Sequence, residues 1–157
     1  MADLLGDGMF KVTWCSTLSN LAAPPVSELN AGTSLELLIT PDGLKIDPDT
    51  ASVDTSSLGS TFNTSSAGRR SFSPAIMFKH QTPTDTAFDL LPYRTSGYLI
   101  VRRNLIATTA WAAGQKVAVY PMQVGEPKET TPAPNAVQTF ESPMMVTSDP
   151  NTRAVVA

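Results

Sequence analysis

The chain has 157 residues, of which 41% are apolar and only 16% charged, and its net charge is −3. This length suits one domain, residues 1–157, and the low charge leaves surfaces that another subunit can cover with little desolvation. The acidic balance argues against a protein that grips nucleic acid, because such binding depends on clustered lysine and arginine, and the pairs at 69–70 and 102–103 form no basic stripe.

The first strand and the first helix are predicted within residues 10–31. Apolar residues alternate with polar ones over 10–14, which predicts a strand with one buried face. A Pro-Pro connector follows, and residues 26–31 can form one or two helical turns that Gly32 ends. We expect residues 1–9, ahead of the first strand, to be mobile.

A second strand is predicted where the alternation resumes, at Leu35, Leu37 and Ile39. The Pro-Asp-Gly sequence at 41–43 reads as a turn, because glycine readily takes a positive φ. Residues 44–46 would then begin a returning strand.

The regular pattern stops in a long polar segment, residues 47–70. Ten of the 17 residues from 50 to 66 are serine or threonine, so the segment reads as a loop or a long hairpin tip and not as core. Structureless loops longer than about 12–15 residues are uncommon in compact domains and are usually functional or disordered. Val53, Leu58 and Phe62 are widely spaced within it, like apolar anchors for a partner's groove.

The second half of the chain begins with apolar residues from 72 to 78 around Pro74, a pattern typical of an edge or bulged strand. A short helix is predicted next, with Thr82 as its N-cap, Pro83 at its first helical position and Pro92 closing it. Such a short helix must pack on a sheet to persist.

The remaining segments predict further strands. Residues 98–101 are apolar on both faces, as in a central strand, and along 116–124 odd and even positions face opposite ways. The last candidate is 136–146, which Pro143 interrupts, and residues 149–157 carry no signal, so we expect a mobile tail. About seven short strands and one main helix predict a mostly β fold, a β-sandwich with a short flanking helix.

The search for catalytic or metal-binding groups finds almost none. Cys15 and His80 are the only cysteine and histidine, and no third residue near either would orient a nucleophile. The acidic Asp-Pro-Asp at 47–49 lacks the regular oxygen ligands and the closing glutamate of a calcium loop. Asp85 and Asp89 would share a helix face that points to water. We therefore predict no enzyme, no cofactor and no metal.

Neither secretion nor membrane insertion is indicated. A single cysteine cannot staple a secreted domain, and the chain begins without a basic region or a long apolar run. We expect no signal peptide and no membrane span, and folding in a cytoplasm.

Five segments form a characteristic combination: A-P-P-V-S-E-L-N-A-G at 23–32, D-G-L at 42–44 before a polar stretch, G-Y-L-I-V-R-R at 97–103, A-A-G-Q-K-V-A-V-Y-P at 112–121 and T-R-A-V-V at 152–156. In this order and spacing, from Val12 to Ala157, they resemble the major tail proteins of siphophages, which build the tail tube.

The resemblance implies a β-sandwich with a helix, assembly into six-fold rings, and stacking of these rings into a hollow tube of the non-contractile kind. Such a tube lies in the virion, is assembled in the bacterial host cytoplasm, encloses a tape-measure protein and meets tail terminator and tail-tip proteins. DNA is a partner only in transit, and a long loop reaches the next ring. We expect the inter-ring interface to contain Asp47, Asp49, Val53, Leu58, Phe62, Arg69 and Arg70.

Two other roles share this composition. A phage head decoration or neck protein would not form long cylinders. A carbohydrate-binding sandwich would need exposed aromatic side chains, for which Trp111 is the one loop candidate, because Trp14 reads as core.

Charge is unevenly distributed along the chain. Residues 1–67 hold eight acids and two bases, a net −6, whereas residues 68–157 hold six acids and nine bases, a net +3. If these halves contribute to opposite ends of the subunit, electrostatic attraction that salt can screen would assist stacking.

Overall fold

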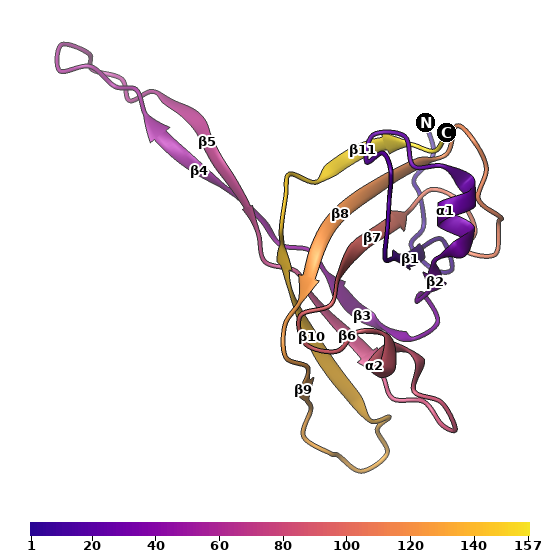
Figure 1. Cartoon of the computed structure of the whole chain (residues 1–157). Coiled ribbons are helices and arrows are strands. Elements are labelled where there is room, and N and C mark those ends of the chain that lie inside the picture. Colours follow the sequence, from indigo (N-terminus) through magenta and orange to yellow (C-terminus); the bar gives the residue numbers. More distant parts are fainter.

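The computed structural model describes residues 1–157, and its regular structure is mostly β (Figure 1). The elements in chain order are β1 (Lys11–Cys15), α1 (Val26–Ala31), β2 (Thr33–Ser34), β3 (Ile39–Lys45), β4 (Pro48–Asp54), β5 (Ser65–Phe72), β6 (Ala75–Lys79), α2 (Thr86–Leu90), β7 (Ser96–Arg102), β8 (Lys116–Val124), β9 (Lys128–Glu129), β10 (Thr139–Val146) and β11 (Asn151–Val155).

Nine of the strands form one antiparallel sheet. Its order is β2-β1-β7-β8-β10-β6-β3, with β11 paired to β8 and β9 paired to β10. Along one side of β8, its first residues pair with β11 and its last residues, Met122–Val124, pair with β10. Strands β4 and β5 make a separate two-stranded sheet.

Strand β10 makes the sheet curl over itself. Its residues Thr139–Pro143 pair with β6, and its residues Met144–Val146 pair with β8. Pro143, which the sequence indicates as an interruption, lies at this transition and is paired with Ala75. The two halves of the sheet therefore face each other, which confirms the mostly β prediction.

The main core lies between these two halves. Ala118, Tyr120 and Met122 of β8 face it, together with Phe78 of β6 and Phe140 of β10, whose rings stack with centroids 5.4 Å apart. The opposite face of β8 presents Val117 and Val119 to a second buried cluster that includes residues of α1. The predicted alternation along 116–124 and the predicted central strand at 98–101 are confirmed.

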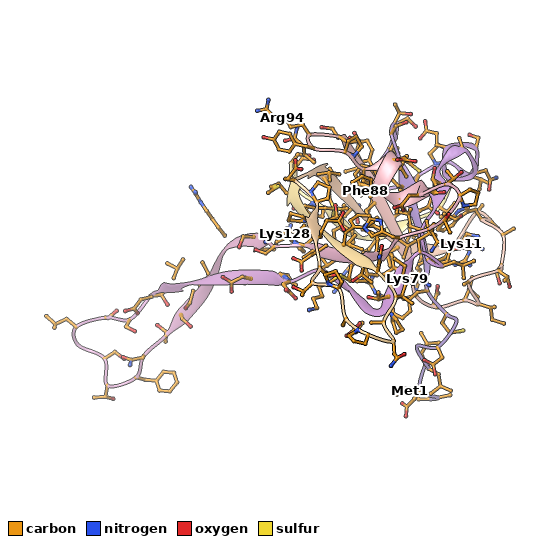
Figure 2. The ribbon with its side chains drawn as sticks, turned by 90° about the horizontal axis from the view of Figure 1, so that it is seen from below. Met1, Lys11, Lys79, Phe88, Arg94 and Lys128 are labelled. Atoms are coloured by element: carbon orange, nitrogen blue, oxygen red, sulfur yellow. The ribbon has the colours of Figure 1, made fainter.

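The polar segment forms a hairpin that projects from the body (Figures 1 and 2). Strands β4 and β5 pair in antiparallel register from Pro48↔Phe72 to Asp54↔Ser65. No residue from 47 to 71 is buried, and of the hairpin only Phe72, the last residue of β5, packs against the main core. Of the two expectations for this segment, loop or hairpin tip, the hairpin is confirmed.

The predicted strand at 35–39 is wrong. The amides of Leu38 and Ile39 both donate to the carbonyl of Leu35, so the chain turns there. Leu35 is fully buried while Leu37 is 81% exposed, which reflects this turn and not a strand with one buried face. The turn predicted at 41–43 lies inside β3, as an irregularity in its pairing with β6.

Three further predictions need correction. The second helix begins at Thr86 and not after Thr82. The Asp85 carboxylate binds the His80 side chain and accepts from the Gln81 N–H, which closes a local turn before the helix. Strand β6 starts after Pro74 and is paired on both sides, so it is no edge strand. The C-terminal segment, which carries no signal in the sequence, contains β11, because pairing with β8 buries Ala154.

Candidate assembly surfaces

The hairpin places the expected interface residues on one projecting element. Val53 on β4 is 50% exposed, and Leu58 and Phe62 in the connecting turn are 107% and 74% exposed. Apolar side chains of this size are worth about 1.5–3 kcal/mol each when fully buried. Within the subunit Leu58 and Phe62 gain little of that stabilisation, and Val53 gains only part of it.

Serine and threonine hydroxyls give the hairpin tip, residues 55–64, a defined shape. Thr55 and Thr64 are joined by an N–H to carbonyl bond of 3.0 Å and by their hydroxyls at 2.9 Å. The Ser56 hydroxyl accepts from the Thr64 N–H at 3.0 Å, and the Phe62 N–H donates to the Ser60 hydroxyl at 3.1 Å. Local hydrogen bonds therefore replace core packing as the source of order in the tip.

Four of the charged residues of the hairpin segment lie at its base, and a fifth, Asp54, ends β4 beside the tip, where its carboxylate accepts from the Ser56 N–H at 2.8 Å. Asp47 and Asp49 are exposed, and neither makes an ion pair within the chain. Arg70 pairs with Asp149 of its own chain, whereas Arg69 makes no ion pair. Of the two arginines that we expected at the inter-ring interface, Arg70 is therefore paired within its own chain and Arg69 is not.

A groove lies beside the N-terminal segment. Residues 6–10 form one wall, and the turn after β2 together with β3 forms the other, enclosing about 510 Å³. Its lining includes the apolar side chains of Phe10, Leu37 and Leu44. We call this hollow the N-terminal groove, and Leu37, at 81%, is the most exposed of these apolar side chains. The sequence gives no sign of it, because its walls come from distant segments.

Arg102 organises the loop that closes one end of the N-terminal groove. Its side chain is fully buried, although it belongs to an arginine pair that reads as a surface feature. Burial lowers the pKa of the Arg102 guanidinium, and the charge of Glu36 opposes this shift. The guanidinium lies over the Trp111 ring at 5.0 Å and donates to four oxygens: the carbonyls of Ile106, Thr109 and Ala110 and the side-chain Oε1 of Gln115.

Trp111 is itself only 7% exposed and packs in the second core. It therefore offers no aromatic surface of the kind that a carbohydrate-binding site requires.

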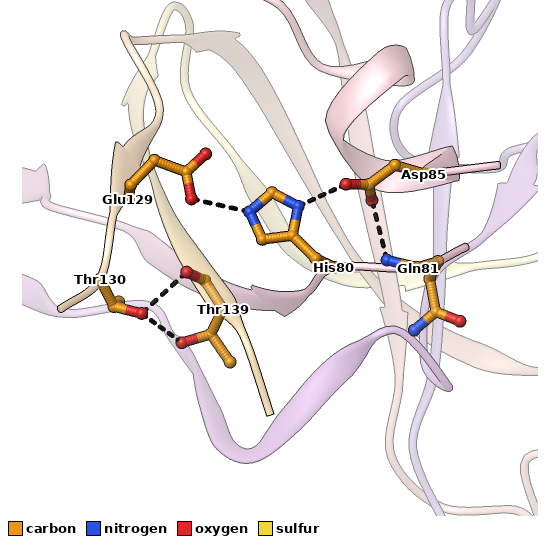
Figure 3. Close-up of polar contacts among 6 residues, drawn as sticks. All are labelled: His80, Gln81, Asp85, Glu129, Thr130 and Thr139. Atoms are coloured by element: carbon orange, nitrogen blue, oxygen red, sulfur yellow. Dashed lines mark hydrogen bonds and ion pairs between the residues drawn. The ribbon is translucent and has the colours of Figure 1, made fainter. Parts of the chain in front are cut away.

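His80 joins three elements at the other end of the body (Figure 3). Its Nδ1 binds the Asp85 carboxylate ahead of α2, and its Nε2 lies 2.8 Å from Oε2 of Glu129 on β9. These bonds, chiefly that to Asp85, raise the pKa of His80. The ring also packs against Phe88 and Phe140, with centroids 5.5 and 4.8 Å away. This cluster fixes the position of α2 and β9. The prediction that Asp85 and Asp89 share a helix face that points to water is wrong, because Asp85 precedes α2 and binds His80.

The structure does not bring the two candidate nucleophile residues together. Cys15 is buried on β1, where burial raises the pKa of its thiol to about 11, and its Sγ lies 3.5 Å from the Glu28 carbonyl oxygen. His80 binds two carboxylates and not the thiol. No group of three or more metal-ligating side chains occurs, and neither helix is long and apolar enough to cross a bilayer.

Comparison with known families identifies the fold. The profile described as phage tail tube protein matches residues 1–157. The chain belongs to the phage tail tube protein family. This is a structural family and not an enzyme family, so the chain is a tail tube subunit, a component of the phage tail. The expected family and the expected absence of enzymatic function are confirmed, and the head decoration and neck roles are not favoured.

Solved structures share the fold across nearly the whole chain. One is a chain of the cryo-EM structure of the anti-feeding prophage (AFP) baseplate, 6-fold symmetrised, with a TM-score of 0.61 and 8% identity over 96% of this chain and 95% of that chain. A second is a chain of the virion of the native gene transfer agent (GTA) particle, with a TM-score of 0.55 and 13% identity over 98% and 99%.

A third similar structure is a chain of the tail of the empty GTA particle, computed with helical refinement and C6 symmetry. Its TM-score is 0.50, with 16% identity over 99% of this chain and 100% of that chain. At these identities the similarity establishes the fold alone. No curated protein sequence matches the chain.

Proposed function

We propose that the subunit forms six-membered rings that stack into a hollow tube, and that this tube conducts DNA during delivery. Two of the similar structures carry six-fold or C6 symmetry in their descriptions, which supports a ring of six. The net charge of −3 suits a channel that passes DNA without gripping it. The tape-measure protein would occupy the lumen, and terminator and tip proteins would bind the two ends.

The observation that carries this proposal is the exposed hairpin. Holding a two-stranded hairpin outside a domain is costly, because an isolated hairpin is marginally stable in water and ordering each residue costs about 1–2 kcal/mol of backbone entropy. None of the residues from 47 to 71 is buried in its own subunit, so contact with another copy is the natural source of compensation. We therefore infer that β4, β5 and the tip connect consecutive rings of a non-contractile tail.

Replacing residues 52–67 with a short Gly-Ser linker tests this role. Because the removed residues contact neither core, the variant should retain its circular dichroism spectrum and a cooperative melting transition. It should form no tubes under conditions in which the unmodified chain does, as seen by negative-stain microscopy. Tubes of normal length from the linker variant would contradict the proposal.

Point substitutions test whether assembly requires the apolar side chains of the hairpin and not only an intact hairpin. Changing Val53, Leu58 and Phe62 together to serine keeps the strand pairing but removes the exposed apolar surface, and we expect this variant to lose assembly. The matched control is Val137→Ser, which removes an apolar side chain that is 65% exposed outside the hairpin, and it should assemble normally.

A further inference from the structure

We propose that the hairpin tip of one copy, residues 55–64, docks in the N-terminal groove of a second copy in the adjoining ring. This inference rests on the proposed function and assigns to the hairpin an acceptor surface. The tip and the groove each present apolar side chains that the subunit itself leaves uncovered: Leu58 and Phe62 on the tip, Phe10 and Leu37 at the groove.

The groove has the size and lining of a binding site. Its volume of about 510 Å³ lies within the range of ligand pockets, roughly 300–1,000 Å³. Apolar side chains from three separate segments line it, and Leu37 stands at 81% exposure beside it. A leucine so placed gains little from its own subunit and would be covered by an incoming apolar side chain.

The two surfaces are also complementary in polar chemistry. Residues 55–64 themselves carry no charge, and the nearest one, on Asp54, lies just before the tip, where its carboxylate accepts from the Ser56 N–H at 2.8 Å. The apolar end of the tip can therefore enter a groove without desolvating an ion of its own. The groove contains the carboxylates of Asp7, Glu36 and Asp42, which accept hydrogen bonds. The hydroxyls of Thr55, Ser56 and Ser60 already donate within the tip, but those of Ser57 and Thr61 do not. These two hydroxyls can donate to the groove carboxylates while the apolar residues fill the floor.

The tip is prepared for docking before contact occurs. Its internal hydrogen bonds, such as the Thr55–Thr64 pair at 2.9 Å, fix its shape in the free subunit. Order that exists before binding reduces the entropy that association must overcome. A hairpin shaped in this way can present Leu58 and Phe62 together to one groove.

The positions of tip and groove suit a polymer. The hairpin leaves the body on the left in both views, while the N-terminus lies toward the right, at the N label in Figure 1 and at Met1 in Figure 2. The groove extends from this N-terminal segment to β3, the strand that precedes the hairpin, so tip and groove are different surfaces of the subunit. A contact between two different surfaces of identical subunits is heterologous, and when it does not close on itself it propagates along an axis. The tip of one copy would therefore meet the groove of the next copy, ring after ring.

Disulfide trapping tests the contact in assembled tubes. One chain carries Leu58→Cys and a second carries Leu37→Cys, and the two are mixed, assembled and oxidised. Native Cys15 is buried with a thiol pKa of about 11, so it gives little background reaction. We expect a shift from monomer to covalent dimer on a non-reducing gel, and the dimer should be absent when either variant is oxidised alone.

The matched control pairs Leu58→Cys with Val137→Cys, because Val137 is 65% exposed and lies outside the groove. A second pair, Asn63→Cys with Asp42→Cys, leaves both leucines intact in case their loss weakens assembly. Cross-linking of either groove pair above the control supports the proposal.

Tubes that form without cross-linking of either groove pair would overturn the assigned acceptor while leaving the tail-tube function intact. Failure of the unmodified protein to form tubes would overturn the proposed function and this inference together.

Discussion

Replacing Arg102 with methionine removes the buried guanidinium from the groove-closing loop while keeping most of its apolar stem. In the native chain this group satisfies three loop carbonyls and the Gln115 side chain, at donor–acceptor distances of 2.9 to 3.4 Å. No carboxylate forms an ion pair with it. The substitution therefore tests whether hydrogen bonds to the loop outweigh the cost of burying an unpaired charge.

Two effects of opposite sign decide the magnitude. Each buried acceptor that loses its donor lowers the unfolding free energy by about 1–3 kcal/mol. Residues 106, 109 and 110 are not buried, however, so water can hydrogen-bond some of the carbonyl oxygens that the guanidinium leaves. Removing a buried charge is favourable, because burial of this cation is itself costly. Counting about two of the four oxygens as unsatisfied, we expect a net loss of about 2–4 kcal/mol in unfolding free energy.

Urea unfolding followed by circular dichroism at pH 7 measures this loss. The matched control is Arg103→Met, which removes an exposed neighbour and should change the unfolding free energy by less than about 0.5 kcal/mol. Hydrogen exchange at the Ala107 amide gives a second readout, since this amide donates to the Gly8 carbonyl at 2.8 Å and should lose protection. A variant as stable as the native chain, with Ala107 still protected, would refute the reasoning.

The remaining predictions concern charge. The raised pKa of His80 means that its stabilising contribution is fully present below the unfolded value of about 6.5 and is lost as pH rises through the folded value. The melting temperature should therefore fall between pH 6 and 9 by more in the native chain than in His80→Phe, which keeps the aromatic contact; parallel profiles would contradict this. Tube elongation should slow near 1 M salt, where the screening length is about 3 Å, if the acidic first and basic second halves of the chain meet across rings. Elongation rates that ignore salt would show the charge division to be incidental.

The sequence predicted elements whose pattern depends on local periodicity. The alternation along β8 and the turn of helix before Gly32 can be read directly, because side chains on opposite faces of a strand meet different environments. The long run of serine and threonine likewise indicated a segment outside the core. These features need only neighbouring residues for their interpretation.

Features that depend on distant residues could not be read in this way. Strand β11 has only a few apolar positions, and it forms because β8 provides a partner. Leu35 and Leu37 look equivalent in the sequence, yet a turn sends one into the core and the other to the surface. The burial of Arg102 depends on carbonyls four to eight residues away, and the walls of the N-terminal groove come from separate segments.

Cryo-electron microscopy of tubes grown from the purified chain tests the central claim most directly. The account predicts hollow tubes of constant diameter with six subunits in each ring, in which the hairpin of every subunit contacts the neighbouring ring. Compact monomers at every concentration, or closed particles in which the hairpin remains in solvent, would contradict it.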